Sequence, residues 1–268
     1  MPAYFDMHCH LDFAPNALDA ARELEALGAG AFAVSVEQGT GFCSSSGCNS
    51  SSSFSQLEQK PVPCSTSMVR WGVGLHPWWV ADGRAGEAEL EAVLAAIPST
   101  IYVGEVGLDF GRKHDGGSAG RARQVHAFER IAAACAEVGG RVLSLHAAAS
   151  APEVFEILTR TGAIENCRCI FHWYSGDGET FHAAVQSGCY FSVNNFMLET
   201  KRGREYARQV PVGQLLLETD MPPEGETYQV AAMQTQLAQT CAAIAQLRGL
   251  DAAALAESIA ETSRALLS

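Results

Sequence analysis

Asp6-Met7-His8-Cys9-His10-Leu11-Asp12 ends the first apolar stretch of the chain and contains a His-x-His pair. Successive side chains of a strand point to opposite faces, so His8 and His10 project to one side and Cys9 to the other. Two imidazoles on one strand face can hold a metal ion, although such a pair is often merely exposed to solvent. The pair therefore predicts a metal site only if other ligands converge on it.

Short apolar stretches alternate with amphipathic ones along the rest of the chain, a pattern typical of βα units around a parallel sheet. Strands are expected at Tyr4–His10, Gly30–Val36, Arg70–Leu75, Ile101–Glu105, Arg141–Leu145, Cys169–His172, Cys189–Val193 and Leu215–Thr219. Helices are expected at Ala17–Leu27, Glu87–Ala96, Ala122–Val138, Ala151–Arg160 and Gly178–Gln186, with two more after Gln229. This alternation favours an α/β fold, a single-domain (β/α)8 TIM barrel over residues 1–268, rather than an open doubly wound sheet.

The composition limits the classes of function. No stretch approaches the ~20 apolar residues of a membrane helix, and no basic segment precedes an apolar run, so we expect a cytoplasmic protein with no membrane partner. The 9 cysteines, without a secretory signal, favour reduced thiols over disulfides. A net charge of −12 disfavours a protein that grips long duplex DNA through its phosphates. A small or end-on anionic substrate stays compatible with that charge if a metal supplies local positive charge.

Two polar segments interrupt the alternation. Residues 41–67 are rich in serine and are expected to form an irregular surface segment, with at most a short helix around Phe54–Gln59. Their three cysteines lack a fourth ligand at the spacing of a zinc knuckle. The polar stretch Gly111–Arg121 follows a strand end and is expected to be a loop beside any active site.

Four more candidate ligands stand at the ends of predicted strands: Glu105, His146, His172 and Asp220. A barrel gathers its active site at the carboxyl ends of its strands, so these residues should meet His8 and His10 around one axis. Any one of them alone is more simply a hydrogen-bonded or capping residue. Together, four histidines and two carboxylates suit two divalent cations and need no thiolate. Glu105 is the most informative, because a carboxylate in a buried strand is costly without a cation.

Five sequence motifs then resemble, in order, those of the TatD family of metal-dependent deoxyribonucleases and related hydrolases, which are amidohydrolase-like barrels. They are Asp6–Asp12, Gly72-Val73-Gly74-Leu75-His76-Pro77, Val103-Gly104-Glu105-Val106-Gly107-Leu108-Asp109, His172 with Ser175-Gly176, and Leu216-Leu217-Glu218-Thr219-Asp220-Met221-Pro222. The resemblance covers most of the chain and implies a TIM barrel with two divalent ions, Zn²⁺, Mg²⁺ or Mn²⁺.

The resemblance also implies residue roles. His8, His10 and Asp220 would bind one ion, His146 and His172 the other, and Glu105 would bridge the two. His76, Trp173 and Ser175 are the expected substrate contacts. Two metals can activate water and polarise a phosphodiester bond, and Asp220 is the expected general base, with Glu105 setting the spacing of the metals. Asp6 and Asp109 are expected to orient histidine N–H groups, although a structural turn role for Asp109 is an equal alternative.

The departures from the family concern the substrate. The family usually has an arginine soon after the strand-five histidine, whereas His146 is followed by Ala147-Ala148-Ala149. An anion-contacting guanidinium is therefore missing, and Arg112, Lys113 or Arg121 could replace it, although solvated loop charges are the simpler reading. Trp78, Trp79, Trp173 and Tyr174 could stack bases, with packing under loops as the alternative.

The predicted function is that of a divalent-metal-dependent phosphodiesterase acting on DNA, a TatD-type deoxyribonuclease that degrades single-stranded or frayed ends as an exonuclease. One alternative is a hydrolase of another ester, an amide or a modified nucleotide on the same centre, which the missing arginine favours. A second is an accessory subunit of a multi-protein DNA-processing or defence system. The sequence identifies no partner protein.

Overall fold

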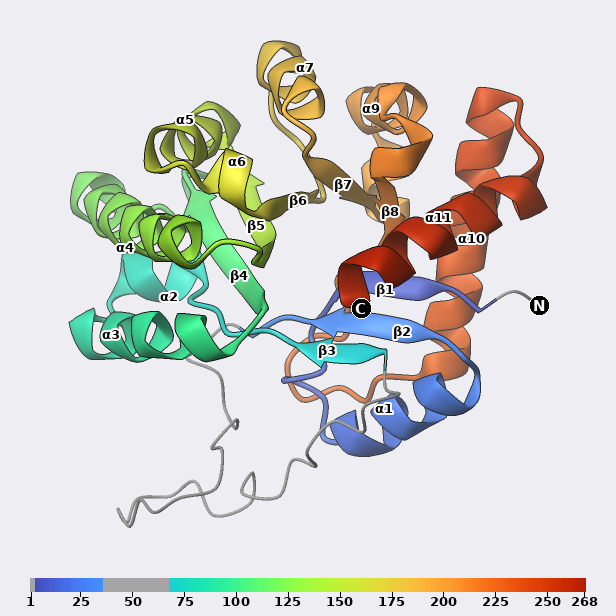
Figure 1. Ribbon diagram of the computed structural model, residues 1–268, viewed down its shortest axis with the longest axis horizontal. Helices are drawn as coiled ribbons and strands as arrows, with labels where there is room; N and C mark the ends of the chain where they lie inside the picture. Colours follow the sequence, from blue (N-terminus) through green and yellow to red (C-terminus); the bar gives the residue numbers. More distant parts are fainter. Residues whose placement is uncertain (1–2, 36–67) are drawn as a thin grey trace.

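The eight expected strands are all present in the computed structural model, which describes residues 3–35 and 68–268 (Figure 1). They are β1 (Phe5–Cys9), β2 (Gly30–Ala33), β3 (Val69–Trp71), β4 (Tyr102–Asp109), β5 (Val142–Ala148), β6 (Arg168–His172), β7 (Tyr190–Val193) and β8 (Leu215–Leu217). All paired strands are parallel, with β1 to β3 in one sheet and β4 to β8 in a second, each in chain order. This order is that of the predicted barrel.

The first seam between the two sheets lies after β3. Val73 and Val103 form a parallel bridge there. A Cβ atom added to Gly74 would lie 2.2 Å from the carbonyl oxygen of Ser35 and 2.4 Å from the amide nitrogen of Glu105. Only glycine permits this approach, because real Cβ atoms essentially never come within 3.0 Å of another heavy atom. The Gly-Val-Gly motif therefore lets the second sheet join the first where Glu105 emerges.

The second seam joins β8 to β1 through single main-chain hydrogen bonds. The N–H of Asp220 donates to the carbonyl of His8 at 3.0 Å, and the N–H of His10 donates to the carbonyl of Met221 at 2.8 Å. The ring of strands is thereby completed between the last strand and the first. These bonds place Asp220 directly beside the His-x-His pair.

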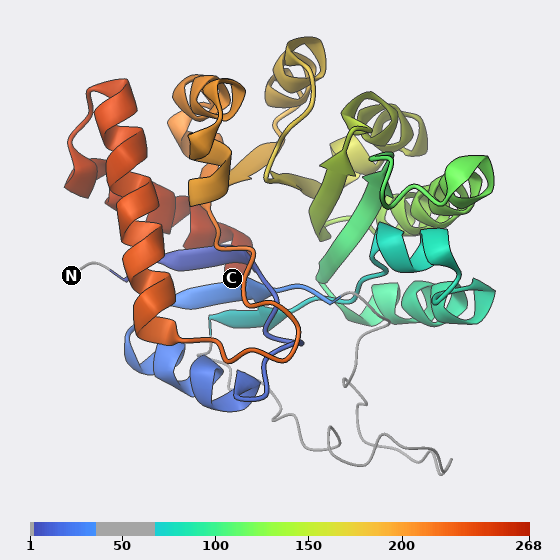
Figure 2. The same cartoon turned by 180° about the vertical axis from the view of Figure 1, so that it is seen from behind.

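Most of the helices surround the strands on the outside of the ring, while the last helix runs across one end of it (Figures 1 and 2). They are α1 (Ala17–Ala26), α2 (Pro77–Asp82), α3 (Glu87–Ala96), α4 (Gly117–Val138), α5 (Ala151–Thr161), α6 (Ala163–Asn166), α7 (Gly178–Gln186), α8 (Asn195–Glu199), α9 (Lys201–Gln209), α10 (Val230–Arg248) and α11 (Ala252–Leu267). Two short 3₁₀ helices, Ile97–Ser99 and Val212–Gln214, precede β4 and β8. None of the helices in the described ranges is long and apolar enough to cross a bilayer.

One apolar cluster joins the amino-terminal parts of the strands to the last helix. Phe5, Phe32 and Tyr102 from the strands pack with Leu266 and Leu267 from α11. Burial of these side chains supplies stability and closes that end of the ring. The polar candidate ligands are therefore confined to the opposite, carboxyl end of the strands.

Several predicted boundaries were wrong. β4 continues to Asp109 instead of ending at Glu105, and β5 continues to Ala148, because the strands keep pairing beyond their first polar side chain. The predicted loop Gly111–Arg121 is helical from Gly117, where α4 begins despite two glycines. The short helices α2 and α8 and the longer α9 were not expected. The serine-rich segment 41–67 lies outside the described residues.

Candidate metal centre

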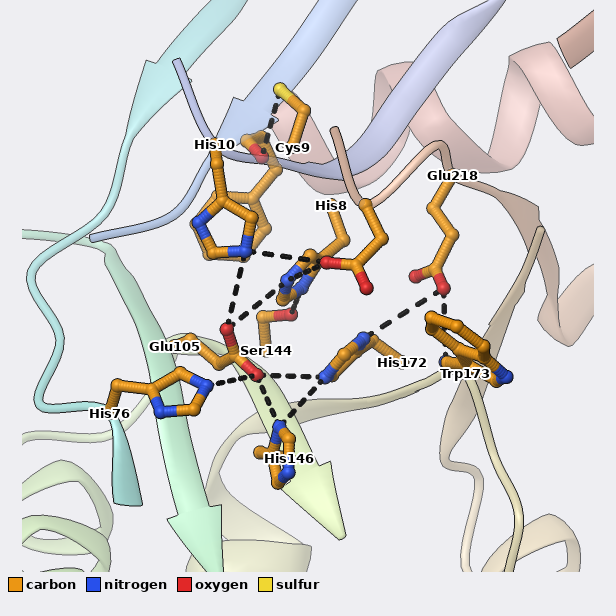
Figure 3. A network of polar contacts seen from close by, with 12 residues as sticks. His8, Cys9, His10, His76, Glu105, Ser144, His146, His172, Trp173 and Glu218 are labelled. Atoms are coloured by element: carbon orange, nitrogen blue, oxygen red, sulfur yellow. Dashed lines mark hydrogen bonds and ion pairs between the residues drawn. The ribbon is translucent and has the colours of Figure 1, made fainter. Parts of the chain in front are cut away.

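The side chains expected to bind metal meet at one pocket, at the carboxyl ends of the strands (Figure 3). The pocket has a volume of about 700 Å³. Its lining includes His10, His76, Glu105, His146, His172 and Asp220, while His8 is fully buried beside them. Residues more than two hundred positions apart are thus brought around one point, as the strand-end rule predicts.

Glu105 lies at the centre of this group, and its two oxygens face different imidazoles (Figure 3). Oε2 lies 3.4 Å from His8 Nε2 and 3.6 Å from His10 Nε2. Oε1 lies 2.5 Å from His146 Nδ1, 2.9 Å from His172 Nε2 and 3.3 Å from His76 Nε2. A carboxylate placed between two nitrogen clusters in this way can bridge two cations.

The first cluster consists of His8, His10 and Asp220, whose ligand atoms all lie within 4.8 Å of one another. Asp220 Oδ1 is 3.4 Å from His8 Nε2 and 3.3 Å from His10 Nε2. Within the described part of the chain, the buried His8 Nε2 has no hydrogen-bond partner. Such an atom is costly unless something satisfies it, and a cation between these groups would do so. The thiol of Cys9 points away, to the carbonyl of Phe32, as strand alternation predicts.

The second cluster contains one residue besides the expected pair of His146 and His172. His76, Glu105 and His146 form a group of potential ligand atoms within 4.8 Å of one another. His172, expected as a ligand with His146, lies 3.4 Å from His146 Nδ1. The resemblance implied that His76 contacts substrate, yet it lies against Glu105 itself. The sequence could not place it there, since its position depends on how α2 begins, with His76 as the capping residue.

Opposite charges hold this group together. Burial raises the pKa of Glu105, but the surrounding imidazoles outweigh burial and hold that pKa well below its usual value. Burial lowers the pKa of His10, yet Asp12 and Asp220 raise it to about 10. The carboxylates thus attract positive charge strongly. Because imidazole binds metal in its neutral form, a divalent cation would take the place of these protons, and the donor set of nitrogens and carboxylate oxygens fits such an ion.

Asp109 connects the centre to the wall of the pocket. Its Oδ2 lies 3.1 Å from His146 Nε2 and accepts a hydrogen bond of 2.5 Å from the indole N–H of Trp78. The Trp78 ring in turn stacks on His114, with ring centroids 3.8 Å apart. This geometry suits the predicted orienting role of Asp109, while Oδ1 accepts a hydrogen bond of 2.7 Å from the Gly111 amide, as the alternative turn role requires. Trp78, considered for base stacking, lines the pocket and holds Asp109 through its N–H.

Glu218 is a member of the site that sequence reasoning missed. It is fully buried and accepts hydrogen bonds from the Trp173 amide at 3.1 Å, from the Asn194 side chain at 2.8 Å and from the Ser192 hydroxyl. Its Oε1 lies 3.8 Å from His172 Nδ1. The available signal was the position of Glu218, a carboxylate directly after a buried strand and two residues before Asp220.

Asp6 was expected to orient a histidine N–H group, but it bonds to other residues. Its carboxylate accepts hydrogen bonds from the Thr219 amide at 2.9 Å, the Thr219 hydroxyl at 2.6 Å and the Tyr228 hydroxyl at 2.8 Å. Burial raises the pKa of Asp6 to about 7, although these bonds oppose the shift. Asp6 therefore joins β1 to the chain after β8, and its described hydrogen bonds reach no histidine.

Removing the Tyr228 hydroxyl tests this junction. At a pH well above 7, where Asp6 is ionised, we expect Tyr228→Phe to lower the free energy of unfolding by about 1.5–3 kcal/mol, because a buried carboxylate loses a donor. Tyr206→Phe is the matched control, since its hydroxyl donates to the neutral carbonyl of Gly176 and its loss should cost only ~1 kcal/mol. Urea unfolding of both variants measures the difference. Equal losses would contradict a special role for the Asp6 junction.

Of the residues expected to contact substrate, some line the pocket and one is buried in the core. Trp173 and Ser175 line the pocket, as do Trp78 and Trp79. Trp173 is 38% exposed and stacks on Phe196, itself 39% exposed, with centroids 5.5 Å apart. Tyr174, by contrast, is buried in the core, so it stacks no base.

The three cations suggested to replace the missing arginine are absent from the described lining of the pocket. These are Arg112, Lys113 and Arg121. Arg121 is instead paired with Asp115, with Nη2 2.8 Å from the carboxylate. Ala147 and Ala148 do line the pocket, so the wall beyond His146 is apolar there.

Fold and site together define a (β/α)8-barrel protein with a candidate centre for divalent metals. The chain belongs to the family described as TatD related DNase, whose model matches residues 5–268. The resemblance drawn from the motifs is therefore confirmed.

Named relatives agree with this assignment. The chain is 30% identical over 192 residues to the 3'-5' ssDNA/RNA exonuclease TatD of Escherichia fergusonii, covering 68% of this chain and 72% of that protein. It is 30% identical over 152 residues to the protein of the same name from Citrobacter rodentium, and this match spans only 56% of each.

Solved structures of similar fold include YJJV, a TatD homologue from Escherichia coli, with a TM-score of 0.71 at 19% identity, covering 98% of this chain and 97% of that one. A TatD family hydrolase from Entamoeba histolytica matches with a TM-score of 0.69 at 14% identity, covering 97% and 96%. At these identities the likeness establishes the fold, and the confirmed (β/α)8 barrel is the one that the sequence predicted.

Proposed function

We propose that this protein is a divalent-metal-dependent phosphodiesterase that removes nucleotides from single-stranded or frayed ends of DNA. The observation that carries the proposal is the placement of Glu105, with one oxygen toward His8 and His10 and the other toward His146 and His172. Relatives named as 3'-5' ssDNA/RNA exonucleases support the choice of nucleic acid as substrate.

The ligand assignment follows from the residues that lie next to each of the two oxygens of Glu105. His8, His10 and Asp220 would hold one ion, and His146 and His172 a second, with His76 close enough to Glu105 to join them. Zn²⁺, Mg²⁺ or Mn²⁺ bound there would acidify water and stabilise the charge that develops on the phosphate.

The protein's own residues would orient the reaction. Asp220 directs Oδ1 toward His8 and His10, and its carboxylate borders the open pocket. We assign it the role of general base, which takes a proton from the attacking water. Asp109 keeps the His146 ring in place, and Trp78 keeps Asp109 in place.

A second candidate is hydrolysis of a different ester or an amide on the same centre. The apolar wall formed by Ala147 and Ala148, where the family usually places an arginine nearby, is the observation that favours it. A nuclease needs cationic contacts to the phosphates of its strand, whereas a small neutral substrate does not.

Cleavage of end-labelled oligonucleotides distinguishes these functions. The test compares single strands, blunt duplexes and duplexes with frayed ends, with bound metal measured on the same preparation. The nuclease proposal predicts progressive shortening from one end, fastest on single strands. Bound metal without DNA cleavage would favour the second candidate. Bound metal without hydrolysis of DNA or of any small ester with added Mn²⁺ would instead favour an accessory protein.

Removal of the metal gives a further prediction. Dialysis against a chelator should reduce cleavage by at least ~100-fold, since the metal would lower the pKa of the attacking water and stabilise charge on the phosphate. Added Mn²⁺ should restore it. Circular dichroism before and after dialysis is the control for unfolding, and undiminished cleavage by chelated, metal-free protein would overturn the proposal.

A further inference from the structure

Arg84 is the only lysine or arginine among the described residues that line the pocket. It follows α2, on the wall that carries His76, Trp78 and Trp79. In a protein of net charge −12, a strand entering this pocket meets little positive charge besides a bound metal. A guanidinium in this position is therefore the natural contact for a phosphate.

Two neighbours fix the orientation of Arg84. Its Nε donates to Asp82 Oδ2 at 2.7 Å, and its amide donates to Asp82 Oδ1 at 3.0 Å. The guanidinium carbon lies 4.8 Å from the centre of the Trp79 ring. Among the described residues, no partner occupies Nη1 or Nη2. The guanidinium is thus held in place, and its Nη1 and Nη2 are available to donate two hydrogen bonds to one phosphate.

The position of Arg84 indicates which phosphate it can reach. His76 caps the start of α2 against Glu105, whereas Arg84 lies beyond the end of this six-residue helix. The helix is about 9 Å long at 1.5 Å per residue. With its backbone a helix length from His76 and its guanidinium turned to Trp79 and Asp82, Arg84 suits a neighbouring phosphate better than the one that is cleaved.

We propose that Arg84 binds the phosphate next to the scissile one in a nucleic-acid strand, and so substitutes from α2 for the arginine missing after His146. The inference rests on the proposed nuclease function. It predicts that the enzyme favours oligonucleotides over phosphodiesters that carry a single phosphate.

Arg121 provides a matched control within the same chain. It also pairs with an aspartate, Asp115, and its guanidinium lies 5.0 Å from the centre of the Phe110 ring. Its side chain is 45% exposed, close to the 55% of Arg84. It does not line the pocket, and its Nη2 is already bonded to Asp115 and to the carbonyl of Phe110. Alanine at either position changes the net charge equally.

The experiment measures KM and kcat of the metal-loaded wild type, Arg84→Ala, Arg84→Lys and Arg121→Ala. The substrates are a single-stranded oligonucleotide and bis(4-nitrophenyl) phosphate, which has one phosphate only. For the oligonucleotide we expect Arg84→Ala to raise KM roughly fivefold, because an ion pair between exposed groups contributes little to binding. Arg84→Lys should raise KM less, since it keeps the charge but not the planar guanidinium. The dependence of log KM on log salt should weaken by about 0.7, the share of one contact with a single strand.

The contrast between substrates decides the outcome. An increase in KM that is specific to the oligonucleotide, and absent from Arg121→Ala, supports the inference. Equal losses on both substrates, or equal losses from both alanine variants, overturn it while leaving the nuclease proposal intact. If the wild type cleaves the small ester but no oligonucleotide, the nuclease proposal and the inference both fail.

Discussion

Glu105→Ala is expected to lose the bound metal and to lower kcat/KM for single-stranded DNA by roughly 10³-fold or more, since the metals supply several kcal/mol of transition-state stabilisation. Both faces of the centre depend on this side chain. Its Oε2 lies 3.4 Å from His8 Nε2 and 3.6 Å from His10 Nε2, and its Oε1 lies 2.9 Å from His172 Nε2. Metal content and single-turnover cleavage, measured on the same sample, test the expectation.

The control for Glu105→Ala is a variant that removes a different buried carboxylate. Asp6→Asn does so, because Asp6 is a buried carboxylate of β1 that bonds to Thr219 and Tyr228 and not to the candidate ligands. It should change the free energy of unfolding and keep the metal. If Glu105→Ala retains two metals per chain, the bridging assignment is wrong. If Asp6→Asn loses them as well, the effect reports disruption of the fold rather than of a ligand.

Most of the candidate ligands that meet in the pocket could be singled out from the sequence, because they lie in buried strands or directly after them. Most of the strands are short and all are largely buried, so a His or Glu stands out against apolar neighbours, as His172 does at the end of β6 and Glu105 does within β4. The parallel order of strands then brings these ends together without further information. For the same reason the number and order of the strands could be predicted, although β4 and β5 extend further than expected.

Residues placed by loops and short helices could not be predicted in this way. The position of Arg84 depends on the turn after α2, and its contact with Asp82 becomes visible only when that turn is folded. Trp78 was a candidate for base stacking, yet its N–H is held by Asp109 across the pocket wall. Tyr174 and Trp173 are adjacent in sequence, but one is buried and the other exposed. Such differences arise from tertiary packing, which local pattern does not encode.

Asp220→Asn is expected to keep the metal but to lower kcat by about 10²–10⁴-fold, the usual contribution of a general base. An amide oxygen can still replace Oδ1 beside His8 and His10, from which Oδ1 lies 3.4 and 3.3 Å. It cannot accept a proton. Burial raises the pKa of Asp220, but the neighbouring imidazoles, His10 first, outweigh burial and hold the pKa below its usual value. The wild-type carboxylate is therefore ionised and ready to act as a base at neutral pH.

Comparison with Asp220→Ala separates the two roles of this residue, since alanine removes the ligand as well as the base. Asparagine should leave KM for a single strand nearly unchanged and abolish the fall in kcat at acid pH that accompanies protonation of the base. Alanine should also reduce metal content. Should asparagine leave kcat at the wild-type value, Asp220 is a ligand only, and the proton of the attacking water must pass to another group. Glu105 and the imidazoles would then be committed to the metals, so the proton acceptor would have to be a solvent molecule or an oxygen of the substrate phosphate.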